Sequence, residues 1–270
     1  MKRFIAYIKN IARGDISLKM FLYRIHHHFS KSKVNFDDDF NWSNYNIHYK
    51  GELEIAKKRY TPAIQSGDYE YNKGKLVKQR DILPIHSNAH LLYETILQLS
   101  PETILEVGCG GGDNLHNIKT LHSKFKLSGI DISREQLDFL ATRHKSLSNS
   151  TKVADITQHD FNYKPVDLVF TQAVIMHIGE TEQRHLVALK NIFKTAKKYI
   201  VLMENWEKHH FLNDINSLVD SGQTNWEQCF LYYHELESNN ATKLIIVSSK
   251  ETNYKPLVSY DVLLNKQVGE

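Results

Sequence analysis

The chain has 270 residues, of which 41% are hydrophobic and 24% are charged. These are ordinary globular values, and they exclude a disordered chain, a collagen-like fibre or a coiled coil as the main structure. The length suits one α/β domain with a large core plus an appendage. The net charge of +3 is uneven, because residues 1–36 hold eight basic residues and one acidic residue. A local basic segment on a slightly acidic body does not indicate a general nucleic-acid binder.

Neither a membrane span nor a secretory leader is visible in the sequence. No apolar run approaches the roughly 18 residues that cross a bilayer, and no apolar segment precedes a small-residue cleavage site. Cys109 and Cys229 lie far apart and belong to no Cys-x-x-Cys pair, so we expect no disulfide framework and no metal site. The pattern predicts a cytoplasmic protein.

Residues 1–84 read as a unit distinct from residues 85–270. Apolar residues recur at helical spacing between Phe4 and Ile25, with basic residues between them, which predicts two short amphipathic helices. Two interpretations stay open: the helices pack on the domain, or residues 1–30 contact another protein or the inner membrane surface as a peripheral element. Residues 31–80 are polar and aromatic and predict an irregular linker that leads into a cap over a pocket.

From residue 85 onward, helical and strand patterns alternate, which is typical of a doubly wound, mainly parallel Rossmann-like sheet. We expect a seven-stranded sheet whose last two strands form an antiparallel hairpin at the edge, with an N-terminal helical cap. Ser133 is a candidate N-cap, and Gly222 lies where a helix should stop. The predicted strands are 103–108, 126–131, 151–154, 166–171, 198–203, 227–233 and 243–248, and the predicted helices are 85–99, 114–124, 134–145, 181–195 and 209–219.

The segment from Thr103 to Leu115 carries the clearest functional signal. An apolar run ends in Glu106, glycines follow at alternate positions, and a helix begins after them. Glycines permit a tight turn and a close approach of the backbone to a ligand, while free N–H groups open the helix. Such a loop, at the carboxyl end of a buried parallel strand, predicts a pocket for a nucleotide-like cofactor.

Further polar residues fall at the carboxyl ends of the next strands. Asp131 lies 25 residues after Glu106, the length of one strand-helix-strand step, and a carboxylate there can accept hydrogen bonds from both ribose hydroxyls. In a dinucleotide fingerprint the third glycine would stand at position 113, where this chain has Asp113. A carboxylate at a helix start disfavours a pyrophosphate, so an uncharged or cationic ligand suits this loop better.

The order and spacing of four motifs resemble those of class I S-adenosylmethionine-dependent methyltransferases. The motifs are Leu-Glu-Val-Gly-Cys-Gly-Gly-Gly at 105–112, Gly-Ile-Asp-Ile-Ser at 129–133, Ala-Asp-Ile at 154–156, and Val-Asp-Leu-Val-Phe at 166–170 followed by Met-His-Ile at 176–178. The resemblance covers about residues 100–205. It implies that S-adenosyl-L-methionine is the cofactor.

The resemblance also implies a role for each matching position. The loop glycines would lie along the methionine portion of the cofactor. Glu106 would hold the loop and approach the ammonium group, and Gln172 would lie near the transferred methyl group. Asp131 would accept hydrogen bonds from the ribose hydroxyls, and Ile132 would pack against the adenine ring. Asp155 and the backbone of Ile156 would form hydrogen bonds with the adenine amine. The implied cofactor-binding residues are Glu106, Gly108, Gly110, Gly112, Asp131, Ile132, Asp155, Ile156 and Gln172.

The acceptor is less clear than the cofactor. Relatives that methylate planar amines resemble one another in an Asn/Asp-Pro-Pro-Tyr/Phe motif, and here the corresponding positions 171–174 read Thr-Gln-Ala-Val. His177 is a candidate base for a hydroxyl acceptor, and packing within its loop is the alternative role. A second polar and aromatic cluster could bind a hydroxylated substrate: Glu204, Trp206, His209 and His210.

We therefore expect a small-molecule methyltransferase acting on a hydroxyl of a sugar, nucleotide sugar or other glycan precursor. An RNA methyltransferase is one alternative, and it would need a continuous basic face near the pocket. A non-catalytic cofactor-binding interaction module is the other.

Overall fold

The computed structural model describes residues 50–51, 53–179, 181–205, 211–234 and 242–257. The amphipathic helices predicted between Phe4 and Ile25, and the first part of the predicted linker, lie outside these residues. In the described part of the chain, no helix is both long and apolar enough to span a bilayer.

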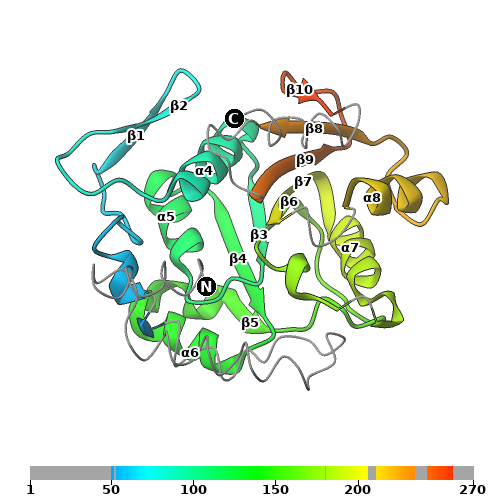
Figure 1. Ribbon diagram of the computed structural model, residues 1–270, viewed down its shortest axis with the longest axis horizontal. Helices are drawn as coiled ribbons and strands as arrows, with labels where there is room; N and C mark the ends of the chain where they lie inside the picture. The colour runs from blue at the N-terminus through cyan, green and yellow to red at the C-terminus, as the bar shows by residue number, and fades with distance from the viewer. Residues whose placement is uncertain (1–49, 52, 180, 206–210, 235–241, 258–270) are drawn as a thin grey trace, which may run out of the picture.

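A central sheet of eight strands organises the described chain (Figure 1). The spatial order is β10-β8-β9-β7-β6-β3-β4-β5. Strands β5, β4, β3, β6 and β7 are parallel, whereas β9 pairs antiparallel with both β7 and β8. The bounds are β3 Thr103–Val107, β4 Lys126–Asp131, β5 Thr151–Val153, β6 Val166–Gln172, β7 Ala196–Asn205, β8 Phe230–His234, β9 Thr242–Ser248 and β10 Lys255–Pro256.

The doubly wound sheet and its antiparallel edge hairpin, both predicted from the sequence, are confirmed. The difference is one extra strand, since the two residues of β10 pair with Tyr232 and Tyr233 of β8. A two-residue strand is too short for an alternating pattern, so it could not be predicted from the sequence. The chain runs outward from β3 to β4 and β5 and then returns to β6 on the other side of β3. Such a reversal opens a crevice at the carboxyl ends of β3 and β6.

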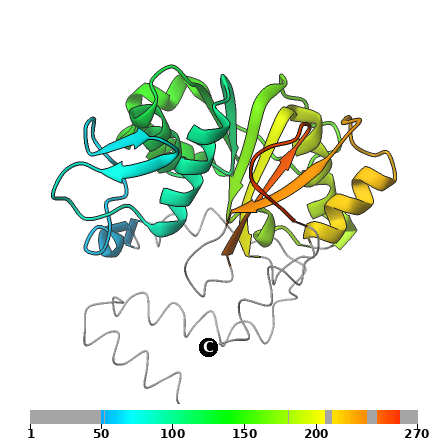
Figure 2. The ribbon, with the colours of Figure 1, turned by 90° about the horizontal axis from the view of Figure 1, so that it is seen from above.

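Helices cover both faces of this sheet (Figures 1 and 2). Three lie on one face, namely α4 Ser87–Leu99, α5 Asp113–Leu121 and α6 Arg134–Arg143, and two lie on the other, namely α7 Arg184–Thr195 and α8 Phe211–Asp220. Alternate residues of each strand feed two separate cores. In β7, Ile200 and Leu202 pack toward α7, whereas Val201 and Met203 pack toward α4. Burial on both faces explains the nearly continuous apolar runs in the sequence.

Local signals set most helix ends. The Ser133 hydroxyl accepts a hydrogen bond from Gln136 N at 3.2 Å and caps α6, as predicted. Gly222, at φ +66°, stands just beyond α8. The predicted start of α7 at residue 181 is wrong by three residues, because Glu182 and Gln183 have left-handed backbone conformations at φ 55°. A short 3₁₀ turn, η3 Thr181–Gln183, therefore precedes the helix.

Residues 69–78 form a β-hairpin where the sequence predicted an irregular linker. Strands β1 Tyr69–Asn72 and β2 Lys75–Lys78 pair antiparallel. The hairpin is tied to α4, because Glu94 accepts a hydrogen bond from Leu76 N at 2.9 Å and one from Lys75 Nζ at 3.2 Å. The hairpin lies beside α4 and α5 (Figure 1). We call residues 53–86, the described segment before α4, the cap; its residues 53–62 and His86 contribute to a pocket, whereas the hairpin does not.

Candidate active site

A pocket of about 530 Å³ opens at the carboxyl ends of β3, β4 and β6. Its wall combines the glycine loop after β3, the turns after β4, β5 and β6, and cap residues. All nine predicted cofactor-binding residues and His177 line it. The fold thus brings together residues that are up to 71 positions apart in the sequence, from Glu106 to His177.

The three alternate glycines of the loop have left-handed backbone conformations but different surroundings. The φ values are +72° at Gly108, +48° at Gly110 and +79° at Gly112. A Cβ at Gly110 would meet only Gln136 Oε1, at 3.8 Å, so this position faces open space. A Cβ at Gly112 would lie 2.6 Å from Leu140 Cγ of α6. The glycine at position 112 is therefore required by packing on α6 as well as by the turn.

Glu106 presents an unsatisfied oxygen inside the protein. Its side chain is buried, Oε1 accepts a hydrogen bond from Asn114 Nδ2 at 2.8 Å, and Oε2 has no hydrogen-bond partner among the described residues. Burial raises the pKa of Glu106 well above its usual range, although the Asn114 bond opposes the shift. A buried acceptor without a donor is costly, and a cationic or N–H-bearing ligand in the pocket would supply one.

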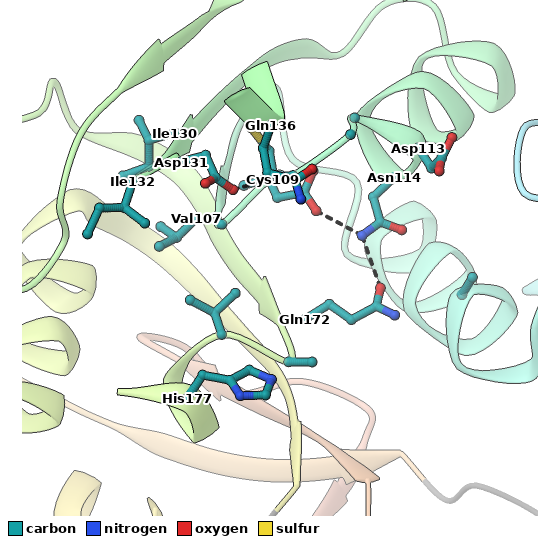
Figure 3. Close-up of a pocket in the computed structure, with 18 of the residues that line it drawn as sticks. Val107, Cys109, Asp113, Asn114, Ile130, Asp131, Ile132, Gln136, Gln172 and His177 are labelled. Carbon is teal, nitrogen blue, oxygen red and sulfur yellow. Dashed lines mark hydrogen bonds between the residues drawn. The ribbon is translucent and has the colours of Figure 1, made fainter. Parts of the chain in front are cut away.

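Asn114 links three walls of the pocket (Figure 3). Its amide nitrogen also donates to Gln172 Oε1 at 3.0 Å, and its Oδ1 accepts from the Tyr93 hydroxyl at 2.8 Å. Both its amide atoms are therefore committed, and they fix the side chains of Glu106 and Gln172. Because Gln172 uses its oxygen for this bond, its Nε2 amino group is the end that remains to serve as a donor.

Asp131, at the end of β4, is held by backbone amides. Its Oδ2 accepts from Gly110 N at 2.8 Å and its Oδ1 accepts from Ser133 N at 2.8 Å. Burial raises the pKa of Asp131, and these two bonds lower it in part. Each carboxylate oxygen has a second lone pair, so the group can still accept from a ligand. Beside it in the pocket wall, the apolar side chain of Ile132 is 49% exposed.

Asp155 closes a tight turn after β5. Its Oδ1 accepts from the backbone and hydroxyl of Thr157 at 2.8 and 2.7 Å, and its Oδ2 accepts from Gln158 Nε2 at 2.7 Å. These bonds and nearby Arg184 outweigh burial and lower the pKa of Asp155. The next residue, Ile156, is buried, and its carbonyl accepts from Asn191 Nδ2 at 2.8 Å. The turn is thus rigidly held at the pocket edge.

Asp113 is the first residue of α5, the position where a dinucleotide-binding loop would bind a phosphate, and its carboxylate binds side chains at the end of α6. Its oxygens accept hydrogen bonds from the Arg143 guanidinium and, at 3.1 Å, from His144 Nε2. The His144 and Arg143 bonds lower the pKa of Asp113 despite its burial. The inference that this loop does not seat a pyrophosphate is consistent with this arrangement.

His177 lies across the pocket from Asp131 and Ile132 (Figure 3). It ends a 3₁₀ turn, η2 Ile175–His177, which follows β6. A second imidazole, His86, lines the pocket from the cap, in edge contact with Tyr60 at 5.3 Å between ring centroids. His86 Nδ1 accepts from Asn88 N at 3.1 Å, and burial lowers the pKa of His86. The neutral ring therefore carries its proton on Nε2.

The predicted substrate-binding role of Glu204 does not fit its placement. The side chain is fully buried at the end of β7 and is not part of the pocket wall. Its oxygens accept bonds from Thr171 Oγ1 at 2.6 Å and from the backbone nitrogens of Val174 and Met176 at 3.0–3.2 Å. The position of Glu204 at a strand end was correctly predicted. The orientation of its side chain was not, because it points toward the turn between β6 and η2. Trp206, His209 and His210 lie outside the described residues.

Sequence reasoning missed two residues that shape the site. Asn114 is one helix residue past the glycine loop, and its polar side chain was the available signal. Arg184 lines the pocket from the start of α7 and donates to Thr157 Oγ1 at 2.8 Å. Nothing in the local sequence marks Arg184, because its neighbours in space come from the turn after β5.

Comparison with known proteins identifies the domain. The family model for a methyltransferase domain matches residues 104–198. The chain is 30% identical over 111 residues to N-methyltransferase 4 of Papaver somniferum, a match that spans 40% of this chain and 27% of that protein's length.

One of the matched solved structures shows the same fold. A TehB-like S-adenosylmethionine-dependent methyltransferase from Corynebacterium glutamicum is 15% identical, with a TM-score of 0.51, over 78% of this chain and 100% of that chain. The N-methyltransferase NodS from Bradyrhizobium japonicum, solved with S-adenosyl-L-homocysteine, is 17% identical, with a TM-score of 0.44, over 61% of this chain and 86% of that chain. The glycine loop, the strand order and the family-model match together identify residues 104–198 as a methyltransferase domain, on the fold of S-adenosylmethionine-dependent methyltransferases.

Proposed function

We propose that this protein transfers a methyl group from S-adenosylmethionine to a hydroxyl of a small molecule, a sugar or glycan precursor, with His177 as the base. The observation that carries the proposal is the shared pocket, since His177 and the cofactor-binding candidates Glu106 and Asp131 line one cavity of about 530 Å³. A cavity of this size is in the range of small-ligand sites.

The residues of the pocket fit this cofactor. The unpartnered Glu106 Oε2 suits an ammonium group, and the open space at Gly110 suits close approach of a ligand to the backbone. Asp131 would accept bonds from the ribose hydroxyls, and the exposed face of Ile132 would pack on the adenine ring. Asp155 and the Ile156 backbone would meet the adenine amine. Gln172 would donate from Nε2 near the sulfonium end.

When bound, S-adenosylmethionine supplies an electrophilic methyl group on a sulfonium sulfur. The protein then has two tasks: to align the acceptor oxygen in line with that methyl group and to remove the hydroxyl proton. A neutral imidazole nitrogen of His177 would take this proton as the new O–CH₃ bond forms.

Several other titratable groups of the pocket wall are already used by contacts of their own. Asp131 and Asp155 accept bonds from their own turns, and Asp113 is committed to Arg143 and His144. In His86, Nδ1 is occupied by the Asn88 amide, so the nitrogen left for a ligand is a donor. His86 would therefore bind the acceptor or the cofactor carboxylate and would not remove a proton.

Three features support a hydroxylated acceptor. Positions 171–174 read Thr-Gln-Ala-Val in place of the motif for planar amines. Imidazoles enter the pocket from both the cap and the β6 side, and Tyr60 offers an aromatic face beside one of them. The basic segment in residues 1–36 would hold the enzyme near membrane-borne glycan precursors.

A second candidate is an amine acceptor, which the name of the Papaver somniferum relative favours. An RNA acceptor has less support. Of the basic side chains in the cap, Lys57 pairs with Glu54, Lys75 with Glu94 and Arg80 with Asp68, so acids balance part of the positive charge there.

Isothermal titration calorimetry tests whether the protein binds the proposed cofactor. Wild-type protein is expected to bind both S-adenosylmethionine and S-adenosylhomocysteine. Asp131→Asn should weaken binding at least ~10-fold, because a charge-assisted bond to a ribose hydroxyl becomes a neutral one. Asp138→Asn, an exposed acid on α6, is the matched control and should bind like the wild type. Absence of binding by the wild-type protein would contradict the proposal.

A screen that measures cofactor turnover with different compounds tests which class of acceptor is methylated. Sugars, nucleotide sugars, small amines and short RNAs would be compared, and the hydroxylated compounds are expected to react. With the active compound, His177→Ala should lower kcat about 100-fold or more and leave cofactor affinity nearly unchanged. His159→Ala, an exposed imidazole after β5, controls for loss of any histidine. Turnover of amines only, or full activity of His177→Ala, would refute the proposed chemistry.

A further inference from the structure

The turn that carries His177 has a strained backbone. Ala173, directly after β6, adopts a left-handed conformation at φ 54° although it is not glycine. Such a conformation is unfavourable for a residue with a Cβ and persists only where the surroundings hold it. Val174 then returns to the right-handed region at φ −112° and ψ −60°. Successive left- and right-handed residues direct neighbouring N–H groups toward one point and form an anion-binding nest.

The anion in this nest is the carboxylate of Glu204. Val174 N donates to both carboxylate oxygens, at 3.1 and 3.0 Å, and Met176 N donates to Oε2 at 3.2 Å. Thr171 Oγ1 adds a bond of 2.6 Å to Oε1 from the strand before the turn. Burial raises the pKa of Glu204, and the bonds from Thr171, Val174, Met176 and Ile175 oppose that shift. The turn and the buried charge therefore stabilise each other.

Several residues of this turn also line the pocket. Gln172 and His177 line it on either side of the nest. Val174 packs so closely on the glycine loop that a Cβ at Gly108 would lie 2.4 Å from Val174 Cγ2. A shift of the turn would therefore move the candidate base, His177, and at the same time Val174, which supports the glycine loop.

We propose that Glu204 is a positioning residue, which sets the place of His177 and Val174 in the pocket through the backbone of residues 173–176. The proposal rests on the proposed function in so far as His177 faces the acceptor. Glu204 touches neither the pocket nor its contents, so it acts only through the turn.

Asp167 offers a matched comparison. It is also a buried carboxylate on the same sheet, it accepts from Glu102 N at 3.0 Å and Thr103 N at 3.2 Å, and Lys198 Nζ lies 3.1 Å away. It stands at the amino end of β6, opposite to the pocket. Loss of its charge should disturb the fold to a similar degree without moving the turn after β6.

The test compares Glu204→Gln with Asp167→Asn in the full-length protein. Glutamine keeps the size of the side chain, but its NH₂ group would face the N–H groups of the nest, donor against donor. Three readouts are measured: the NMR signal and titration midpoint of the His177 imidazole, assigned with His177→Ala; the Kd for S-adenosylhomocysteine; and kcat and KM with the acceptor from the screen. Neither NMR nor product binding needs a known acceptor, so a failure of the proposed chemistry is distinguishable from a failure of this proposal.

We expect Glu204→Gln to move the His177 signal and midpoint, to weaken product binding several-fold, and to lower kcat about 100-fold, as small misplacements of catalytic groups do. Asp167→Asn should leave all three readouts near wild-type values. Glu204→Asp, which keeps the charge, should recover part of each effect. Should Glu204→Gln fail to fold, Thr171→Val removes one bond to the carboxylate at constant shape and should shift the His177 signal in the same direction. An unmoved His177 signal, or equal effects of the two charge-removing variants, would overturn the proposal.

Discussion

At the scale of single residues, Gly110 and Gly112 illustrate how one motif serves two purposes. Both have positive φ values, but a Cβ would enter open pocket space at Gly110 and strike Leu140 of α6 at Gly112. We therefore predict that the first glycine is needed for a ligand and the second for the fold. Alternate glycines in a sequence predict a close backbone approach, but they do not reveal which partner approaches each one.

Alanine substitutions at these positions separate the two purposes. Gly110→Ala should cost about 1–2 kcal/mol of stability, the price of a left-handed alanine, and should weaken S-adenosylmethionine binding at least ~10-fold because the methyl group occupies ligand space. Gly112→Ala adds overpacking to the same backbone strain and should lose a further ~1–3 kcal/mol. Urea unfolding and calorimetry on both variants provide the check. Equal stability losses with equal binding would show that the two glycines do not differ.

At the scale of secondary structure elements, Asp113 connects α5 to α6. Its carboxylate receives Arg143 and His144 from the last turn of α6, and His144 stacks on His116 at 4.3 Å between ring centroids. This tie holds the start of α5, and with it the glycine loop, against the helix that follows Asp131. Arg143 also donates to Gly111 O at 3.2 Å within that loop.

Asp113→Asn should therefore lower the free energy of unfolding by about 2 kcal/mol near neutral pH, since hydrogen bonds to a charged group are lost. The pKa of Asp113 is lower in the folded protein than its ordinary value of 3.8. Its stabilisation is thus present above that value and lost as the pH falls through the folded pKa. Urea unfolding of both proteins at several pH values should show a difference in unfolding free energy near neutral pH that closes only as the pH falls below 3.8. Asp138→Asn on the exposed face of α6 should show no such gap.

The elements that could be predicted from the sequence are those that the central sheet buries on both sides. β6, for instance, runs over residues 166–172, where residues 166–171 were predicted, since burial of its first six residues requires a largely apolar run. The β1–β2 hairpin was missed although Lys73 and Gly74, both with positive φ, form its two-residue loop. Its short strands have one buried face and many polar residues, so the Asn-Lys-Gly turn was the only local signal.

The site shows the same division. Positions at strand ends, such as Asp131 and Gln172, follow from the order of elements and were predicted. The direction of a side chain depends on neighbours that are distant in sequence, as Glu204 and Arg184 show. Pattern and spacing therefore predict which residues reach the pocket edge, and tertiary packing decides which of them face the ligand.

At the scale of the whole molecule, the cap and the methyltransferase domain share one buried amide. Asn117 of α5 accepts from Ile64 N at 2.9 Å and donates to Pro62 O at 2.8 Å and to the Tyr93 hydroxyl at 2.9 Å. Pro62 lines the pocket, so this amide sets how the described part of the cap closes over the site.

Asn117→Ala should loosen the cap without unfolding the sheet. Loss of these bonds is expected to lower the free energy of opening residues 61–68 by about 2 kcal/mol, which corresponds to roughly 30-fold faster amide exchange there. Amides of β6 and β7 should keep their protection, and S-adenosylhomocysteine should dissociate faster because a wall of the pocket opens more often. Hydrogen exchange followed by mass spectrometry measures the first two effects, and stopped-flow displacement measures the third.

Asn191→Ala is the matched control for this experiment, because Asn191 is also a buried amide, on the opposite face of the sheet. It donates to the carbonyls of Ile156 and Gln158, both at 2.8 Å. Its loss should speed exchange around residues 156–158 and leave the cap protected. If Asn117→Ala instead accelerates exchange evenly over the described chain, then the cap does not open as a separate unit, and the cap and the sheet unfold together.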